Sequence, residues 1–136
     1  MKKKSVFITL LVACLTSCYP SNTVLRKKMI AKYSDDQNYV TLTGEVTEFD
    51  KNNVIIKCEE LRNYISYQKE LCDYYIYSDN FVQLKAEDEI EFVTVPFHFY
   101  NGHKLPIVEL KKDGITLLAY EEGKKNLIDW VNTNFK

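Results

Sequence analysis

The stretch YVTLTGEVTEF, residues 39–49, decides the fold class, because its apolar and polar residues alternate. One face of this stretch carries threonine and glutamate, and the other carries Val40, Leu42, Gly44 and Val46. A period of two predicts a strand with one buried face. Gly44 in the middle of that strand predicts a bulge or a close approach of another backbone.

Further strands follow along the chain. Turn-forming residues at 50–53 (DKNN) precede an apolar return strand at 54–58 (VIIKC), and 73–77 (DYYIY) has high β-propensity. Residues 60–71 fit a helix and a strand equally well. Residues 78–88 begin with helix-capping residues and predict one or two turns of helix.

The last third of the chain predicts a strand, a meander and a closing helix. The apolar phase shifts within a long strand at 89–100, so we expect a bulge there, and Pro96 fits a bulge or an edge. The pair Asn101-Gly102 is the strongest hairpin signal in the chain. The remaining elements are a strand at 103–111, a turn at 112–114, a strand at 115–120 and an amphipathic helix at 121–135.

This order of elements resembles the OB-fold, a small five-stranded barrel. The resemblance spans residues 39–120 and rests on the strand order, on Gly44 and on the helix-like insert at 78–86. The run L-x-A-x-D-x-I-x-F at 84–92 looks like the approach to the fourth strand of small exported OB-like domains. We therefore expect a mostly β fold with flanking helices, namely an OB-like barrel with a C-terminal helix. An SH3-like barrel or another small α+β domain is the alternative.

Three lysines and an apolar run at 5–15 begin the chain. The run, about eleven residues long, is too short to span a membrane but long enough for the h-region of a signal peptide. The motif Leu15-Thr16-Ser17-Cys18 follows, and with it these residues resemble the signal sequence of a bacterial lipoprotein. The resemblance implies cleavage before Cys18 and lipidation of its sulfur. The pattern also fits Cys14, less well, because the apolar run would be shorter.

We predict a signal peptide at 1–17, a lipid-anchored tether at 18–35 and one globular domain at 36–136, held at the extracytoplasmic face of the cell membrane. Within the tether, 24–33 predicts a basic helix capped by Thr23. Its basic side chains could contact anionic lipid, and a solvated basic linker is an equally supported alternative. Loss of the signal peptide removes three lysines and changes the net charge from −1 to −4. A mildly acidic surface argues against nucleic-acid binding.

Two cysteines remain after this processing, Cys58 and Cys72. Outside the cytoplasm such a pair can form a disulfide, worth about 3 kcal/mol for a loop of this length. Two buried free thiols are an equally supported alternative. A zinc site is not predicted, because neither histidine is spaced near these cysteines.

Residues suited to catalysis are scarce. The two histidines, His98 and His103, flank the predicted turn and could hold a metal ion together with Glu109. A small metal-dependent hydrolase using His98 and His103 is therefore the alternative function. The sequence has no G-x-S-x-G, H-E-x-x-H or glycine-rich phosphate loop, and its acidic residues cluster where solvated turns are expected. We predict no enzyme, no metal site and no cofactor.

Tyrosine is the residue type that indicates binding. A tyrosine cluster falls within a short segment and comprises Tyr64, Tyr67, Tyr74, Tyr75 and Tyr77. OB-type barrels bind oligomers through aromatic side chains on their second and third strands, and tyrosine is enriched in interfaces. A tyrosine-rich core is the competing interpretation. We predict a membrane-anchored, non-catalytic module that binds an envelope protein, peptide or glycan.

Overall fold

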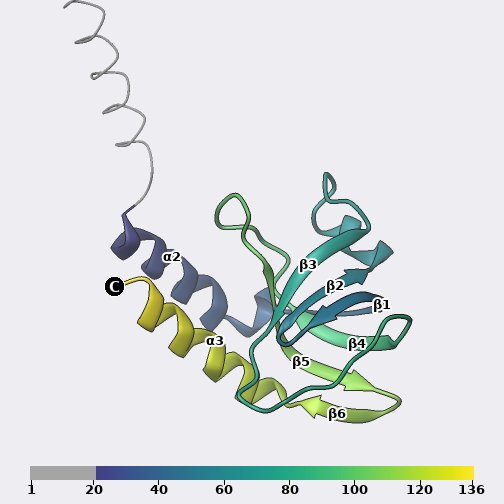
Figure 1. The fold of residues 1–136 in the computed structure, drawn as a ribbon. Helices are drawn as coiled ribbons and strands as arrows, with labels where there is room; N and C mark the ends of the chain where they lie inside the picture. Colours follow the sequence, from purple (N-terminus) through teal and green to yellow (C-terminus); the bar gives the residue numbers. More distant parts are fainter. Residues whose placement is uncertain (1–20) are drawn as a thin grey trace, which may run out of the picture.

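The computed structural model describes residues 21–136 (Figure 1). The predicted signal peptide and the lipidation site at Cys18 lie outside these residues. The elements are α2 (Asn22–Ser34), η1 (Asp36–Asn38), β1 (Val40–Asp50), β2 (Asn53–Lys57), η2 (Glu59–Asn63), β3 (Leu71–Ile76), β4 (Glu89–Thr94), β5 (Leu105–Lys112), β6 (Ile115–Leu118) and α3 (Tyr120–Asn134), where η marks a 3-10 helix.

Five strands close into a barrel in the order β1-β2-β3-β5-β4 and back to β1. All neighbours are antiparallel except β3 and β5, whose parallel pairing aligns Tyr74–Ile76 with Leu105–Ile107. β6 forms a hairpin with the C-terminal end of β5. This strand order is that of an OB-fold. The predicted mostly β fold, an OB-like barrel with a C-terminal helix, is confirmed.

Strand β1 pairs with two neighbouring strands, each along a different half of its length. Its segment Val40–Glu45 pairs with β4, and Glu45–Asp50 pairs with β2. The strand passes very close to β2 at Gly44, where a Cβ atom would lie 2.5 Å from Ile56 Cγ2 and 2.8 Å from the carbonyl oxygen of Lys57. The predicted close backbone approach is therefore confirmed, and a bulge follows later in the same strand.

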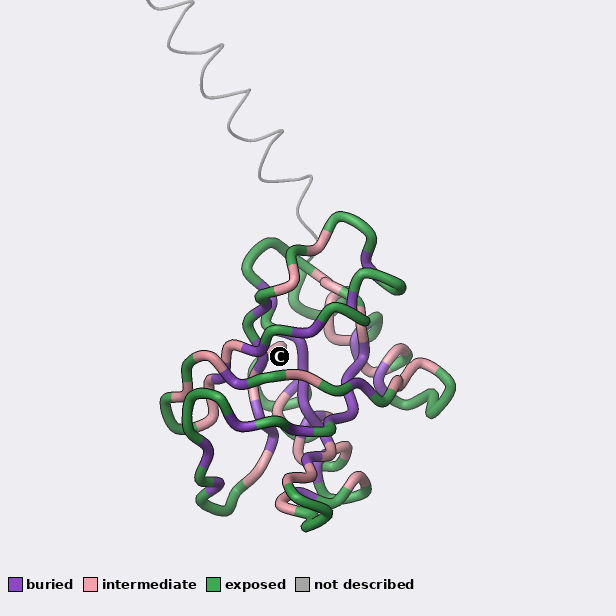
Figure 2. Tube along the Cα trace, turned by 90° about the vertical axis from the view of Figure 1, so that its right-hand side faces the viewer, coloured by how far each residue is buried: buried purple, intermediate pink, exposed green. Residues whose placement is uncertain are grey.

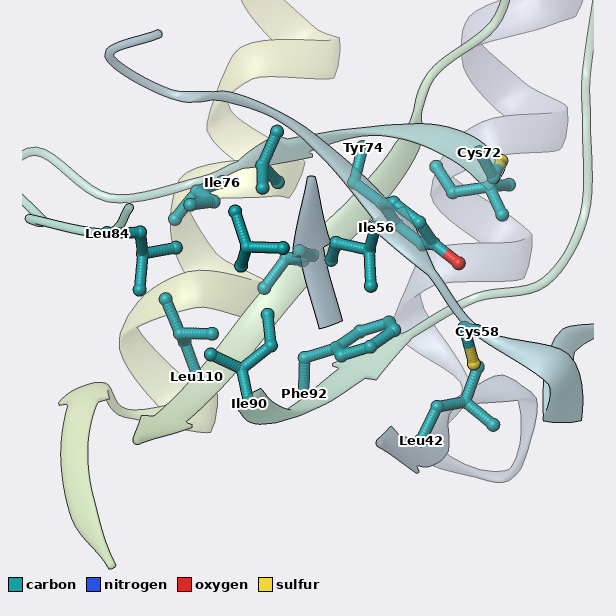
Figure 3. Packing of buried hydrophobic residues seen from close by; sticks show 14 of the residues in the cluster. Leu42, Ile56, Cys58, Cys72, Tyr74, Ile76, Leu84, Ile90, Phe92 and Leu110 are labelled. Carbon is teal, nitrogen blue, oxygen red and sulfur yellow. The ribbon is translucent and has the colours of Figure 1, made fainter. Parts of the chain in front are cut away.

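Apolar side chains from all five barrel strands fill the interior (Figure 3). Tyr74 and Phe92 meet edge to face inside it, with ring centroids 5.1 Å apart. The core residues that lie on the five barrel strands are Leu42, Val46, Val54, Ile56, Cys72, Tyr74, Ile76, Ile90, Phe92, Leu105, Ile107 and Leu110.

The segment 78–88 forms no helix, contrary to the prediction. Its apolar residues Val82 and Leu84 alternate with exposed residues, and both are buried in the barrel core. At its start, the Ser78 hydroxyl accepts a hydrogen bond of 3.2 Å from the N–H of Asn80. Such local side-chain bonds compete with helical backbone bonding. The segment therefore crosses the end of the barrel as an extended loop.

The predicted long strand at 89–100 is shorter than expected, because β4 ends at Thr94. The register of β4 against β5 shifts between Val93 and Thr94, so the predicted bulge is confirmed. Pro96, which has no N–H to donate to a ladder, lies just beyond the strand. Residues 95–104 form a loop that connects β4 to β5.

Helices α2 and α3 form an antiparallel pair beside the barrel (Figure 1). Met29 and Tyr33 of α2 and Leu127 and Val131 of α3 are fully buried with Val108 of β5 in a second apolar cluster. Buried segments gather in the middle of the molecule, and the loops that project from it are mostly exposed (Figure 2). Within residues 21–136, no helix has the length and apolarity needed to cross a membrane.

The helix α2 differs from the predicted tether over 18–35. Residues 22–34 are helical and belong to the folded unit, because Met29 and Tyr33 pack against α3 and the barrel. The cap also differs from the prediction: the hydroxyl of Ser21, not Thr23, accepts a hydrogen bond of 3.3 Å from the N–H of Val24. The C-terminal helix α3 agrees with its predicted range.

Helix α3 lies against β5 at Gly123. A Cβ atom at this position would lie 2.0 Å from the carbonyl oxygen of Val108, a backbone atom that cannot move alone. Glycine at this site therefore sets the distance between the closing helix and the barrel.

We predict that Gly123→Ala destabilises the protein by about 1–3 kcal/mol through overpacking. In an exposed helix the same change stabilises by about 1 kcal/mol, so the sign of the effect is diagnostic. Urea unfolding measures it, with Asn132→Ala on the exposed face of α3 as the control. A stabilised Gly123→Ala variant would contradict the close packing of α3 on β5.

Candidate functional site

Two loops form a pocket at one end of the barrel. The loop from η2 to β3 (64–70) and the loop from β4 to β5 (95–104) project from the same end (Figure 1). Residues of both loops and of β3 line an open pocket of about 580 Å³. The lining residues are Tyr67, Gln68, Leu71, Cys72, Asp73, His98, Tyr100, Asn101, Gly102 and His103.

The predicted turn at Asn101-Gly102 forms the tip of the β4–β5 loop. Gly102 has a φ of 82°, which glycine adopts without strain. The N–H of His103 donates to the carbonyl oxygen of Tyr100 at 3.1 Å and closes the turn. Tyr100 and His103 therefore stand on either side of the turn, at the pocket.

His98 joins the two loops across the pocket. Its Nδ1 lies 3.0 Å from the carbonyl oxygen of His103, and its Nε2 lies 3.0 Å from Oε1 of Gln68. A carbonyl oxygen can only accept, so Nδ1 carries a proton and donates it. Nε2 then accepts, and the Gln68 side chain completes the pair by presenting its NH2 group in place of its oxygen. One side chain thus holds the loops in a fixed relation.

His103 connects the β4–β5 loop to α2. Its Nε2 lies 3.1 Å from the hydroxyl of Tyr33, and its Nδ1 has no hydrogen-bond partner among the described residues. Burial raises the pKa of Tyr33, so the hydroxyl keeps its proton. If Tyr33 donates to Nε2, one polar group, the N–H at Nδ1, remains unpaired. If the imidazole proton were on Nε2, both Nδ1 and the hydroxyl proton of Tyr33 would be unpaired. We therefore assign the imidazole proton to Nδ1.

The pKa of His103 gives a pH prediction. Burial, with a smaller contribution from His98, lowers this pKa from 6.5 to about 4. The unfolded chain therefore binds more protons between pH 6.5 and 4. Above pH 6.5, His103 is neutral in both states and does not reduce the free energy of unfolding. As the pH falls from 6.5 to 4, the free energy of unfolding decreases by up to about 3 kcal/mol.

We predict that wild-type protein loses more of its free energy of unfolding between pH 7 and 4.5 than a His103→Gln variant. Urea unfolding at both pH values measures the difference. Equal losses in the two proteins would show that His103 is not held neutral by burial.

The tyrosine cluster does not share one face, which corrects the predicted binding surface. Tyr74 is fully buried and Tyr77 is 7% exposed, because Tyr74 points into the barrel and Tyr77 into the helix-covered cluster. Tyr75 is half-buried and packs on Tyr77. Tyr64 and Tyr67 are 52% and 79% exposed, and of the five tyrosines Tyr67 alone lines the pocket.

The effect of a substitution on the free energy of unfolding distinguishes a tyrosine of the core from an exposed tyrosine of the pocket. We predict that Tyr74→Ala costs about 3–5 kcal/mol, as expected for an aromatic core residue, and that Tyr67→Ala changes stability by less than about 0.5 kcal/mol. Tyr74→Phe should be neutral or stabilising, because the Tyr74 hydroxyl is buried without a partner among the described residues. Thermal and urea unfolding measure all three. A large loss in Tyr67→Ala would place that ring in the core.

Cys58 and Cys72 are free and buried, so the structure adopts the free-thiol alternative. Cys72 lies opposite Ile56, and the N–H of Cys58 donates to the carbonyl oxygen of Glu70 at 3.0 Å. The cysteines are therefore diagonal neighbours in the antiparallel pair of β2 and β3. Burial raises both thiol pKa values, that of Cys72 to about 12.

The two histidines and Glu109 do not form a metal site. The imidazole rings lie 6.2 Å apart and nearly perpendicular, and each histidine has a nitrogen in a hydrogen bond with a neighbouring residue. Glu109 pairs with Val93 within the β5 ladder and does not line the pocket. Among residues 21–136, no three His, Cys, Asp or Glu side chains are grouped to hold a metal ion. The metal-dependent hydrolase therefore lacks a ligand set in this part of the chain.

Sequence reasoning did not identify Gln68, Leu71, Asp73 or Tyr100 as parts of a site, and it named Cys72 only as a candidate for a disulfide. The Asn101-Gly102 turn gave a signal for a projecting loop with Tyr100 beside it. Which segment faces that loop depends on the closure of the barrel, which no local pattern encodes.

Comparison with known proteins gives few matches. No protein-family model and no curated protein matches the chain. Among solved structures, apo-CusF from Escherichia coli (residues 6–88) is 15% identical, with 55% of this chain and 87% of that chain covered and a TM-score of 0.41. Ag(I)CusF gives 15% identity, coverage of 55% and 97%, and a TM-score of 0.42. A CusF variant with Cu(II) is 14% identical, with 58% of this chain and 96% of that chain covered and a TM-score of 0.42. A likeness this weak says nothing about what this chain binds.

Proposed function

We propose that this chain is a membrane-anchored, extracytoplasmic binding module without catalytic activity, whose ligand occupies the pocket between the η2–β3 and β4–β5 loops. The observation that carries the proposal is the aromatic wall of the pocket. Tyr67 and Tyr100 stand on the two opposite loops, 79% and 40% exposed, around one cavity. Exposed tyrosines at a concave site offer a large contact area at low cost in conformational entropy.

The chemistry of the lining favours a neutral or cationic ligand. The lining residues include the carboxylate of Asp73 and no lysine or arginine. Gln68 and Asn101 add amide groups that can donate and accept hydrogen bonds. An envelope peptide or a neutral glycan suits this pocket, whereas a phosphorylated ligand would find no lysine or arginine among the lining residues.

A lipid on Cys18 would hold this pocket near the membrane. Cys18 precedes the α2 cap, Ser21, by three residues, which span at most about 11 Å. The exposed Lys27 and Lys28 lie in the first half of α2, where anionic headgroups would attract them. Helix α2, about 20 Å long, would then separate the barrel from the bilayer.

Binding is tested with the matched variants Tyr67→Ala and Tyr64→Ala. Both rings are exposed on the segment between η2 and β3, and Tyr64 does not line the pocket. We expect full-length protein to retain peptide or glycan components of an envelope extract, Tyr64→Ala to retain the same components, and Tyr67→Ala to lose them. Equal retention by both variants would contradict this pocket as the binding site.

The anchor is tested separately by fractionation of cells that express wild-type protein or Cys18→Ala. We expect wild-type protein to incorporate labelled palmitate and to sediment with membranes, and Cys18→Ala to do neither. Labelling that persists in Cys18→Ala and is lost in Cys14→Ala would move the anchor to Cys14.

A further inference from the structure

The pocket borders a strand edge that has no partner. β3 pairs with β2 from Leu71 to Tyr75, but with β5 over Tyr74–Ile76 alone. The edge of Leu71–Asp73 that faces away from β2 is therefore not covered by any strand of residues 21–136. The same three residues line the pocket.

The hydrogen bonds of β3 with β2 show which residues face β2. The N–H of Cys58 donates to the carbonyl oxygen of Glu70 at 3.0 Å, and the N–H of Ile76 donates to that of Asn52 at 2.8 Å. In an antiparallel strand, the backbone groups of successive residues face opposite edges. The even-numbered residues of β3 therefore direct their backbone groups toward β2.

The odd-numbered residues face the other way. Just past β3, the N–H of Tyr77 donates to the carbonyl oxygen of Ile107 at 3.0 Å, which places the β5 side at odd positions. The N–H groups of Leu71 and Asp73, and the carbonyl group of Leu71, therefore point to the open side where the pocket lies. They form a donor–acceptor–donor row with the spacing of an extended strand.

We propose that the pocket binds an extended polypeptide segment, which adds as a short strand to the open edge of β3 at Leu71–Asp73. This inference rests on the proposed function and names its ligand. Backbone hydrogen bonds to Leu71 and Asp73 supply the register, as in other cases of strand addition. The segment takes the space beside the start of β5, between β3 and the β4–β5 loop.

The side chains around the edge define the sequence of the segment. Tyr67 and Tyr100 offer aromatic faces to an apolar side chain, and the carboxylate of Asp73 favours a lysine or arginine nearby. The segment is therefore neutral or basic, with at least one apolar residue. The hydroxyl groups of a glycan do not have the regular spacing of the N–H and carbonyl groups in a peptide backbone. A glycan would therefore pair less well with the backbone groups of Leu71 and Asp73.

The test uses full-length, ¹⁵N-labelled protein in detergent micelles. The probes are a heptapeptide selected from a displayed random library and a neutral chito-oligosaccharide. We expect the peptide to bind and to slow hydrogen exchange of the Leu71 and Asp73 amides at least tenfold. N-methylation of the peptide at the paired positions should weaken binding about tenfold or more, because buried partners are left unsatisfied.

Variants of Leu71 separate backbone from side chain. Leu71→Pro removes the N–H that faces the pocket and leaves the bonds to β2 in place, whereas Leu71→Ala changes the side chain alone. We expect Leu71→Pro to weaken peptide binding at least tenfold more than Leu71→Ala does. The N-methylated peptide gives the same information without altering the protein, should Leu71→Pro misfold.

The outcomes distinguish this inference from the proposed function. Binding of the oligosaccharide with loss in Tyr67→Ala, and no binding of any selected peptide, would overturn strand addition and leave the binding module intact. Peptide binding that N-methylation does not weaken would also overturn strand addition. If neither probe binds, both the inference and the proposed pocket fail.

Discussion

The parallel pairing of β3 with β5 is the interaction on which the rest of the structure depends. It aligns three residues of each strand, Tyr74–Ile76 and Leu105–Ile107. This pairing closes the curved sheet into a barrel. Closure buries Tyr74 and Phe92 against each other and forms the core in which Val82 and Leu84 are also buried. Because the ladder is so short, it also leaves one edge of the first half of β3, the edge that faces away from β2, without a strand partner beside the pocket.

The helices add a second constraint, because they cover the barrel where β4 and β5 pass beneath them. Val108 of β5 lies under α3 at Gly123, while its neighbours Ile107 and Leu110 point into the barrel. From the same helical layer, the hydroxyl of Tyr33 reaches His103 in the β4–β5 loop. The helix nearest the predicted anchor is thus in contact with a residue of the pocket wall.

Local patterns predicted those parts of the fold that depend on local physics. The alternation around Leu42, the close approach at Gly44 and the turn at Asn101-Gly102 all follow from residues near one another in the chain. The expected helix at 78–88 failed because Val82 and Leu84 bury into a core built by distant strands. The tyrosine cluster failed as one surface for the same reason, since the barrel and the helices bury Tyr74 and Tyr77 from opposite sides of β3.

Native-state hydrogen exchange by NMR tests the partial closure of the barrel most directly. In the free protein, we expect the amide of Tyr77, bonded to Ile107, to exchange as slowly as the barrel core. The amides of Leu71 and Asp73 should exchange orders of magnitude faster, because they face the open side. Equal protection of all three amides would show that the edge is already paired, and fast exchange at Tyr77 would show that the barrel is not closed.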